Sequence, residues 1–200
     1  MARETEYHYY MFNKPFGCVT ARRDALYPTV MDYFRELGNP SLSPVGRLDR
    51  ETEGLLLVTD DGKWNMRLTD PEYHSPKTYE FTVLGHLDRT GCELLEGGVD
   101  LPQTGRTTAP AAVEITGYSV LRECMRDIHP ETAEKIRRNL PDTPVTFGRI
   151  TITEGKKHQV RKMMKCAGCY VIALRRIAMG GFRLDETLRP GQWKEIKTGE

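Results

Sequence analysis

A charged loop that runs directly into an apolar strand constrains the fold of this chain most strongly. Residues 47–53 hold three acidic residues and two arginines, and the strand expected at 54–59 is apolar throughout Leu55–Val58. Such a strand is anchored in the core, and a loop on such a base is well held for a functional role. Gly46 and Gly54 bracket the loop and permit tight backbone conformations. The loop is therefore either a solvated, salt-bridged surface or a functional site.

Strand and helix periods follow one another irregularly along the chain. Residues 77–84 alternate strictly, with Tyr79, Phe81 and Val83 on one face, which indicates a half-buried strand. From residue 157 the spacing of apolar residues becomes helical. We expect further strands at 7–13, 111–115, 145–153 (with a bulge at Gly148) and 170–174, and further helices at 28–37, 64–68, 88–96 and 131–139. This mixture predicts an α+β fold with a largely antiparallel sheet.

The overall composition is that of a globular protein. Hydrophobic residues make up 38% and charged residues 28% of the chain. No apolar run approaches the roughly 20 residues of a membrane span. Residues 1–6 lack an apolar region and include acids, so they do not resemble a secretory signal. We therefore expect a cytoplasmic protein.

The five cysteines do not form a recognisable framework. Only Cys166 and Cys169 make a CxxC pair, and no second pair supplies the other two ligands of a zinc site. We expect buried, reduced thiols and no metal.

The charge is distributed unevenly. Residues 1–120 hold 12 Lys and Arg against 18 Asp and Glu, whereas residues 121–200 hold 17 against 10. Residues 155–176 contain seven basic residues and no acidic one. Such asymmetry favours a surface that faces a polyanion, although a solvated basic face is also common.

Gly46–Asp49, followed by Thr52–Gly62, resembles the catalytic motif of the pseudouridine synthases. Three further segments resemble motifs of the same family and occur in the family's order: Met11–Gly17, Lys77–Tyr79, and Glu154–Met163 with Leu174–Arg176. The branch that they resemble is the RsuA-like (RsuA/RluB/RluE/RluF-type) branch, which acts on ribosomal RNA. The resemblance spans about residues 7–196, nearly the whole chain.

This resemblance implies that residues 1–200 form a single pseudouridine synthase catalytic domain. The family fold is α+β, with a mixed, mainly antiparallel sheet, flanking helices and a central RNA cleft, and we expect two lobes at approximately 1–116 and 117–200. Members of this branch usually carry an S4-type RNA-binding domain before the catalytic domain. This sequence starts at the first motif, so we expect no S4 domain and targeting by the catalytic domain or a partner. Residues 128–143 match no family motif and are interpreted as a variable insertion.

The resemblance also implies roles for four side chains. Asp49 matches the catalytic carboxylate, which acts either as a nucleophile at C1′ or as a base at C2′ of the target uridine. Arg161 matches the arginine that pairs with this carboxylate, and Tyr79 matches the tyrosine that stacks on the uracil. Arg47 matches the residue that fills the place of the flipped base. Without the resemblance, the sequence pattern predicts that Tyr79 is a core aromatic and that Arg161 belongs to a basic helix face.

The other expected substrate contacts are one apolar side chain and a set of basic ones. Leu174 either lines the base pocket or belongs to the core. The basic side chains would bind phosphates without reading sequence: Lys14, Lys156, Lys157, His158, Lys162, Lys165, Arg175 and Arg176. The alternative for this set is a solvated face.

An isomerisation of uridine requires no redox cofactor and no energy source, so we expect no cofactor. The expected partner is RNA, with ribosomal RNA favoured by the branch, and a monomer is the family's default. Two other functions stay open: a catalytically inactive RNA- or ribosome-binding module on the same fold, and a hydrolase that uses Asp49 with Glu51 or Glu53. The presence of Asp49, Tyr79 and Arg161 together favours the synthase.

Overall fold

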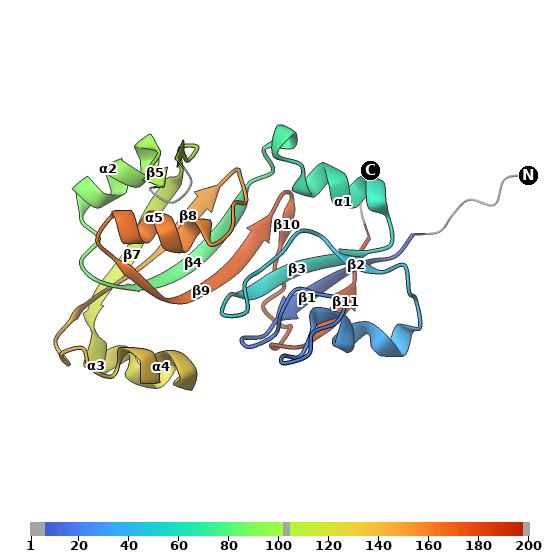
Figure 1. Cartoon of the computed structure of the whole chain (residues 1–200), viewed down its shortest axis with the longest axis horizontal. Helices are drawn as coiled ribbons and strands as arrows, with labels where there is room; N and C mark the ends of the chain where they lie inside the picture. Colours follow the sequence, from blue (N-terminus) through green and yellow to red (C-terminus); the bar gives the residue numbers. More distant parts are fainter. Residues whose placement is uncertain (1–6, 102–104, 198–200) are drawn as a thin grey trace, which may run out of the picture. The chain divides into compact units, whose positions relative to one another are not determined.

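The structure is a computed structural model that describes residues 7–101 and 105–197 of the 200-residue chain. The chain divides into two compact units (Figure 1): unit 1 comprises Met1–Ser75 and Arg176–Glu200, and unit 2 comprises Pro76–Arg175. This division differs from the one expected near residue 116. That position lies inside a long strand that pairs along its length within unit 2.

Unit 1 is built on antiparallel strands from both ends of the chain. Strand β1 (Tyr9–Lys14) lies between β11 (Trp193–Glu195) and β3 (Glu53–Thr59) and pairs antiparallel with both. The short β2 (Ser43–Pro44) pairs antiparallel with β3. The apolar strand predicted at 54–59 is therefore confirmed as β3, whose residues from Gly54 onward are all buried.

One face of these strands packs against a helix. Met11, Leu55 and Leu57 are buried there and pack with Trp64 of α1 (Gly62–Thr69). The short 3-10 helix η2 follows α1 at Pro71–Tyr73. Alternation along the strands sends the other side chains to the opposite face.

The opposite face carries an aromatic cluster. The rings of Tyr10 and Phe12 lie 5.7 and 5.5 Å, centroid to centroid, from the ring of Phe34. Trp193 of β11 stacks on Phe34 at 5.5 Å. Phe34 belongs to η1 (Val30–Leu37), a 3-10 helix that occupies the position of the helix predicted at 28–37.

Unit 2 is built on three long antiparallel strands. Strand β4 (Lys77–Leu84) pairs along its whole length with β8 (Pro144–Ile152), and β8 pairs with β7 (Ala112–Val120). The bounds of β4 are those predicted from its alternation. Strand β9 (Tyr170–Met179) lies beside β4 and continues into unit 1, where it pairs with β10 (Phe182–Arg183).

The helices of unit 2 lie on both sides of these strands (Figure 1). Leu84, Val145 and Ile172 of the strands form one cluster with Leu121 of α3 and Ile136 of α4. The helices are α2 (Arg89–Gly97), α3 (Leu121–Cys124), η3 (Met125–Asp127), α4 (Pro130–Ile136) and α5 (Gln159–Cys166). The segment 128–143, which matched no motif, therefore contributes α4 to this core.

A register shift in this sheet lies opposite Gly148. It falls between Ile115 and Gly117 of β7, so the extra residue belongs to β7 and not to β8, where the bulge was expected. A Cβ at position 148 would lie 2.5 Å from the Phe81 ring and 2.5 Å from the Glu114 carbonyl oxygen. Glycine is required here because the neighbouring strands approach too closely for a side chain.

The α+β class with a mainly antiparallel sheet is confirmed. A small hairpin of β5 (Asp100–Leu101) and β6 (Arg106–Thr107) was not expected, because its strands are too short to show a period. None of the described helices combines the length and apolarity needed to cross a membrane.

Candidate active site

Asp49 lies between β2 and β3 of unit 1, and its backbone is held on both sides. The Thr20 hydroxyl donates to the Leu48 carbonyl (2.8 Å) and accepts from the Leu48 amide (3.1 Å). The Thr52 amide donates to the Asp49 carbonyl (3.0 Å). Leu48 is buried and Asp49 is half-buried. The loop thus presents a partly exposed carboxylate on a fixed backbone, which is what a catalytic group needs.

The Lys14 side chain is buried beneath this loop and binds its backbone carbonyls. The side chain is fully buried, and its ammonium donates to the carbonyls of Pro15 (3.0 Å), Arg50 (3.4 Å) and Thr52 (2.9 Å). Burial lowers the pKa of this ammonium from 10.5 to about 8, while the negative charges of Glu53 and Asp49 oppose the shift. The expected phosphate contact of Lys14 is therefore wrong, because loop carbonyls use the ammonium.

The two arginines of the loop have different surroundings. Arg47 is exposed. Arg50 places its guanidinium 4.7 Å from the ring centroid of Tyr27 and 5.8 Å from that of Phe16, and it lies 3.4 Å from the Glu51 carboxylate. These cation–π contacts hold the Arg50 side chain, while Lys14 binds the Arg50 carbonyl. Neither Tyr27 nor Thr20 was predicted, because both come from a segment without a family motif.

Arg176 is also buried, with 1% of its surface exposed. Its Nε donates to the Leu55 carbonyl at 2.8 Å. The prediction that Arg176 binds phosphate is wrong, because β9 does not end at Leu174 but continues through this position. Alternation along the strand turns Arg176 inward and leaves Arg175 half-buried.

Two of the predicted catalytic residues lie in unit 2. Tyr79 lies in β4 opposite Ile150 of β8 and keeps 8% of its surface exposed. Arg161 lies on α5, is half-buried, and donates from Nη1 to the Val171 carbonyl at 3.2 Å. Leu174 is buried, with 4% of its surface exposed, which agrees with its core alternative.

Helix α5 is amphipathic, as its spacing predicted. Val160, Met163 and Met164 are buried on one face. The basic residues of the expected RNA surface differ in exposure: Lys157, His158 and Lys165 are exposed, and Lys162 is half-buried. These four side chains can still meet a phosphate backbone.

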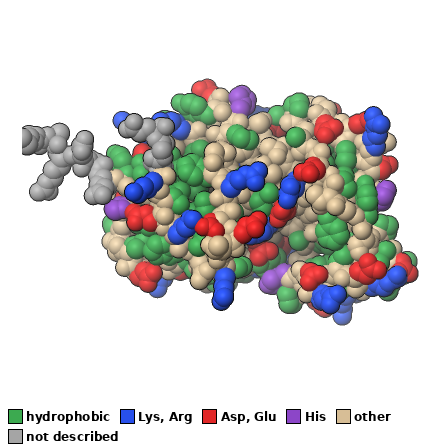
Figure 2. All heavy atoms as spheres, turned by 180° about the vertical axis from the view of Figure 1, so that it is seen from behind, with side chains coloured by type: hydrophobic (Ala, Val, Ile, Leu, Met, Phe, Trp, Pro, Cys, Tyr) green, Lys and Arg blue, Asp and Glu red, His purple; other side chains and the backbone are tan. Residues whose placement is uncertain are grey.

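The other two basic residues of this set are engaged by acids of unit 2. The ammonium of Lys156 lies 2.8 Å from the Glu154 carboxylate, and a guanidinium nitrogen of Arg175 lies 3.7 Å from the Glu80 carboxylate. On the face drawn in Figure 2, blue and red side chains are interspersed and form no continuous basic patch among the described residues. Net charge alone therefore does not mark the RNA-binding face.

Among residues 7–101 and 105–197, no group of three or more His, Cys, Asp or Glu side chains is arranged to hold a metal ion. All five cysteines are free thiols. Cys18, Cys124 and Cys169 are buried as expected, whereas Cys166 is exposed and Cys92 is partly exposed.

The predicted site residues fall into two groups. Asp49 and Arg47 belong to unit 1, where the structure brings Lys14 to the Asp49 loop. Tyr79 and Arg161 belong to unit 2, with the basic residues of α5. The meeting of these two groups around one uracil stays a prediction.

Similarity to known proteins covers nearly the whole chain. The sequence profile of the family described as RNA pseudouridylate synthase matches residues 8–165. The uncharacterized RNA pseudouridine synthase YtzG of Bacillus subtilis is 37% identical over 98% of this chain and 72% of its own length. Ribosomal small subunit pseudouridine synthase A of Escherichia coli is 34% identical over 100% of this chain and 75% of its own. A solved structure titled as a crystal structure of pseudouridylate synthase has a TM-score of 0.77 at 33% identity, covering 96% of this chain and 71% of its own.

Proposed function

The chain belongs to the RNA pseudouridylate synthase family, and we propose that it converts a uridine of ribosomal RNA to pseudouridine with Asp49 as the catalytic carboxylate. The observation that carries the assignment of Asp49 is the support of its loop. Lys14 holds the loop carbonyls from inside, and Thr20 holds both backbone groups of Leu48. A loop fixed in this way keeps the carboxylate in one position relative to the sugar.

The reaction breaks the N1–C1′ bond, joins C5 to C1′ and releases the C5 proton to solvent, while N1 gains a proton, so that the product is an isomer of uridine. A single carboxylate serves either as the nucleophile at C1′ or as the base at C2′. We propose that the ring of Tyr79 stacks on the flipped uracil. Base–aromatic stacking is worth roughly 1–3 kcal/mol and offsets much of the cost of flipping the base. We assign Arg161 a part in the same reaction, because it occupies the family position of an arginine that acts with the catalytic carboxylate.

RNA contacts are assigned to the exposed basic residues only. Arg47 lies two residues before Asp49 and is exposed, which suits a side chain that replaces the flipped base. Lys157, His158 and Lys165 are exposed at and around α5, with Lys162 half-buried beside them, which suits phosphate contacts. A ribosomal RNA substrate fits a cytoplasmic enzyme.

The test is tritium release from ribosomal RNA that carries uridine labelled at C5. The wild-type protein should release tritium, because isomerisation exchanges the C5 proton, and Asp49→Asn should not. Glu51→Gln is the matched control: it removes the same charge from the same loop and should keep most of the activity. Equal release by Asp49→Asn and wild type would remove Asp49 from the mechanism.

The alternative is an RNA-binding module without catalysis. It predicts retained affinity for ribosomal RNA with no tritium release from any ribosomal or transfer RNA. Measuring binding and release on the same RNA preparation separates the two functions.

A further inference from the structure

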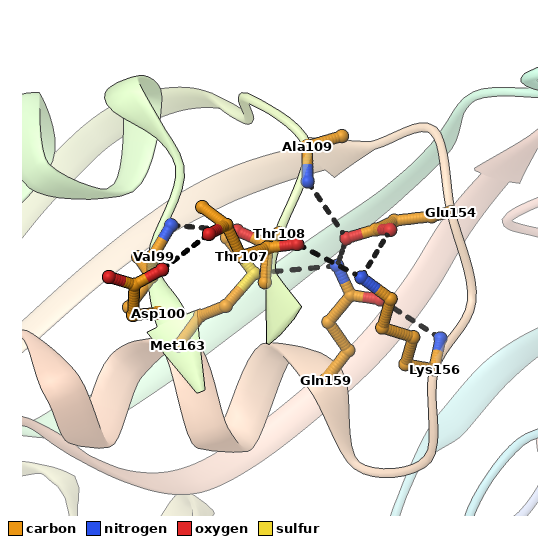
Figure 3. A network of polar contacts seen from close by, with 9 residues as sticks. All are labelled: Val99, Asp100, Thr107, Thr108, Ala109, Glu154, Lys156, Gln159 and Met163. Atoms are coloured by element: carbon orange, nitrogen blue, oxygen red, sulfur yellow. Dashed lines mark hydrogen bonds and ion pairs between the residues drawn. The ribbon is translucent and has the colours of Figure 1, made fainter. Parts of the chain in front are cut away.

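Three polar side chains at the start of α5 form a closed network with the segment that follows β6 (Figure 3). One carboxylate oxygen of Glu154 accepts from the Ala109 amide (3.0 Å) and from the Gln159 side-chain amide. The other oxygen pairs with the ammonium of Lys156 at 2.8 Å. A carboxylate with three donors around it is fixed in orientation.

Gln159 is the centre of this network. It is buried, with 3% of its surface exposed, and both ends of its amide are used. Its oxygen accepts from the Lys156 backbone amide (2.9 Å), and its nitrogen donates to Glu154 and also contacts the Met163 sulfur at 3.7 Å. Lys156 completes the ring by donating from Nζ to the Thr107 carbonyl at 3.2 Å.

The network encloses a strained turn. His158, between Lys156 and Gln159, has a φ of 55° in the left-handed region, which costs a non-glycine residue about 1–2 kcal/mol. The backbone amide of Gln159 donates to the backbone carbonyl of Lys156 across this turn at 3.1 Å. Such a conformation persists only where the surroundings hold it. Here the Gln159 side chain spans the turn by accepting from the Lys156 backbone amide, and Glu154 holds that side chain in place.

This turn sets where α5 begins, and Arg161 follows Gln159 by two residues. The far end of the Arg161 side chain is held separately by the Val171 carbonyl at 3.2 Å. The network therefore fixes the backbone position from which the Arg161 side chain starts, and only from that position does its guanidinium reach the Val171 carbonyl of β9.

We propose that Glu154 and Gln159 are positioning residues for Arg161: they hold the left-handed turn at His158 and thereby the placement of the guanidinium used in the reaction. Lys156 belongs to this network and not to the phosphate contacts, because its charge is neutralised by Glu154. The proposal rests on the proposed function for its catalytic consequence, whereas the structural consequence is independent of it.

The main variant is Glu154→Gln, which keeps the shape but sets an amide NH₂ against the Lys156 ammonium. The single-turnover rate of tritium release with saturating enzyme should fall between about tenfold and a hundredfold, as expected for a displaced catalytic group. The dissociation constant for ribosomal RNA should change much less, because Lys157 and Lys165 are untouched. Glu134→Gln, which breaks the exposed Glu134–Arg137 pair (3.0 Å), is the matched control and should leave the rate unchanged.

Two further measurements separate positioning from general destabilisation. In an Arg161→Lys background, Glu154→Gln should add little further loss, because both changes act through the same guanidinium. The double variant Glu154→Gln with Lys156→Met should recover most of the rate, since both partners of the ion pair are then neutral. Full additivity with Arg161→Lys, or no recovery in the double variant, would overturn the proposal.

Amide hydrogen exchange of residues 157–160 tests the network without catalysis. Exchange there should be faster in Glu154→Gln than in wild type, and unchanged in Glu134→Gln. If the wild-type protein releases no tritium, the proposed function fails, and this measurement still decides the network. Unchanged exchange in Glu154→Gln would refute it.

Discussion

The buried ammonium of Lys14 predicts that unit 1 becomes more stable at alkaline pH through this residue. Its pKa is about 8 in the folded protein, against an ordinary 10.5. Between these values the unfolded chain binds one proton more than the folded protein, so the free energy of unfolding rises with pH. The difference between the two pKa values corresponds to about 3 kcal/mol in the free energy of unfolding, since each pKa unit is worth about 1.4 kcal/mol.

Cys18 acts in the opposite direction and has to be removed from the comparison. Burial raises the pKa of its thiol from 9.0 to about 11, so the folded protein holds that proton longer and stability falls as pH rises through this range. We therefore compare Cys18→Ala with the double variant Cys18→Ala and Lys14→Met. Only the first protein can titrate at position 14.

Urea unfolding followed by tryptophan fluorescence is the assay. Trp64 and Trp193 are the two tryptophans of the chain and both lie in unit 1, so the signal reports that unit. The difference in unfolding free energy between the two proteins should change by about 3 kcal/mol in favour of the Lys14 protein between about pH 7.5 and about pH 10.5. A difference that stays constant to within about 1 kcal/mol would refute the argument from burial.

Three other substitutions have outcomes that unfolding in urea can check, followed by far-UV circular dichroism, which reports both units. Thr20→Val removes both hydrogen bonds to Leu48 and should cost about 1–3 kcal/mol and slow tritium release, whereas Thr20→Ser should retain both properties. Gly148→Ala should cost about 1–3 kcal/mol or more, because the new methyl group meets the Phe81 ring at 2.5 Å; a neutral result would contradict the packing described. Asp61→Ala removes the cap that accepts two backbone amides at the start of α1 and should cost about 1–2 kcal/mol while leaving the rate of tritium release unchanged.

Periodicity predicted the elements whose own residues decide their environment. The strand at 77–84 and the amphipathic helix near 157–167 were found because one face of each is buried, which leaves a repeat in the sequence. The family motifs likewise pointed to Asp49, whose backbone proves to be firmly held.

The burial of charged side chains was not predictable in this way. Lys14 and Arg176 look like surface cations in the sequence, yet backbone carbonyls distant in the chain, those of Thr52 and Leu55, accept their hydrogen bonds. Nothing local distinguishes them from Lys157, which is exposed. The position of the register shift was also not predictable from local sequence. The extra residue lies in β7 and not in β8, and this depends on how the two strands pair.

The split composition of unit 1 has a consequence for the order of events during synthesis. All residues of unit 2 leave the ribosome before Trp193–Glu195, so unit 2 can fold while unit 1 still lacks its edge strand. Two contacts of Tyr10 can form only after this segment is synthesised: its backbone pairing with Glu195 and the packing of its ring against Trp193. Until β11 has been synthesised, one edge of β1 therefore lacks its partner strand, and an unpaired edge of this kind is prone to aggregation.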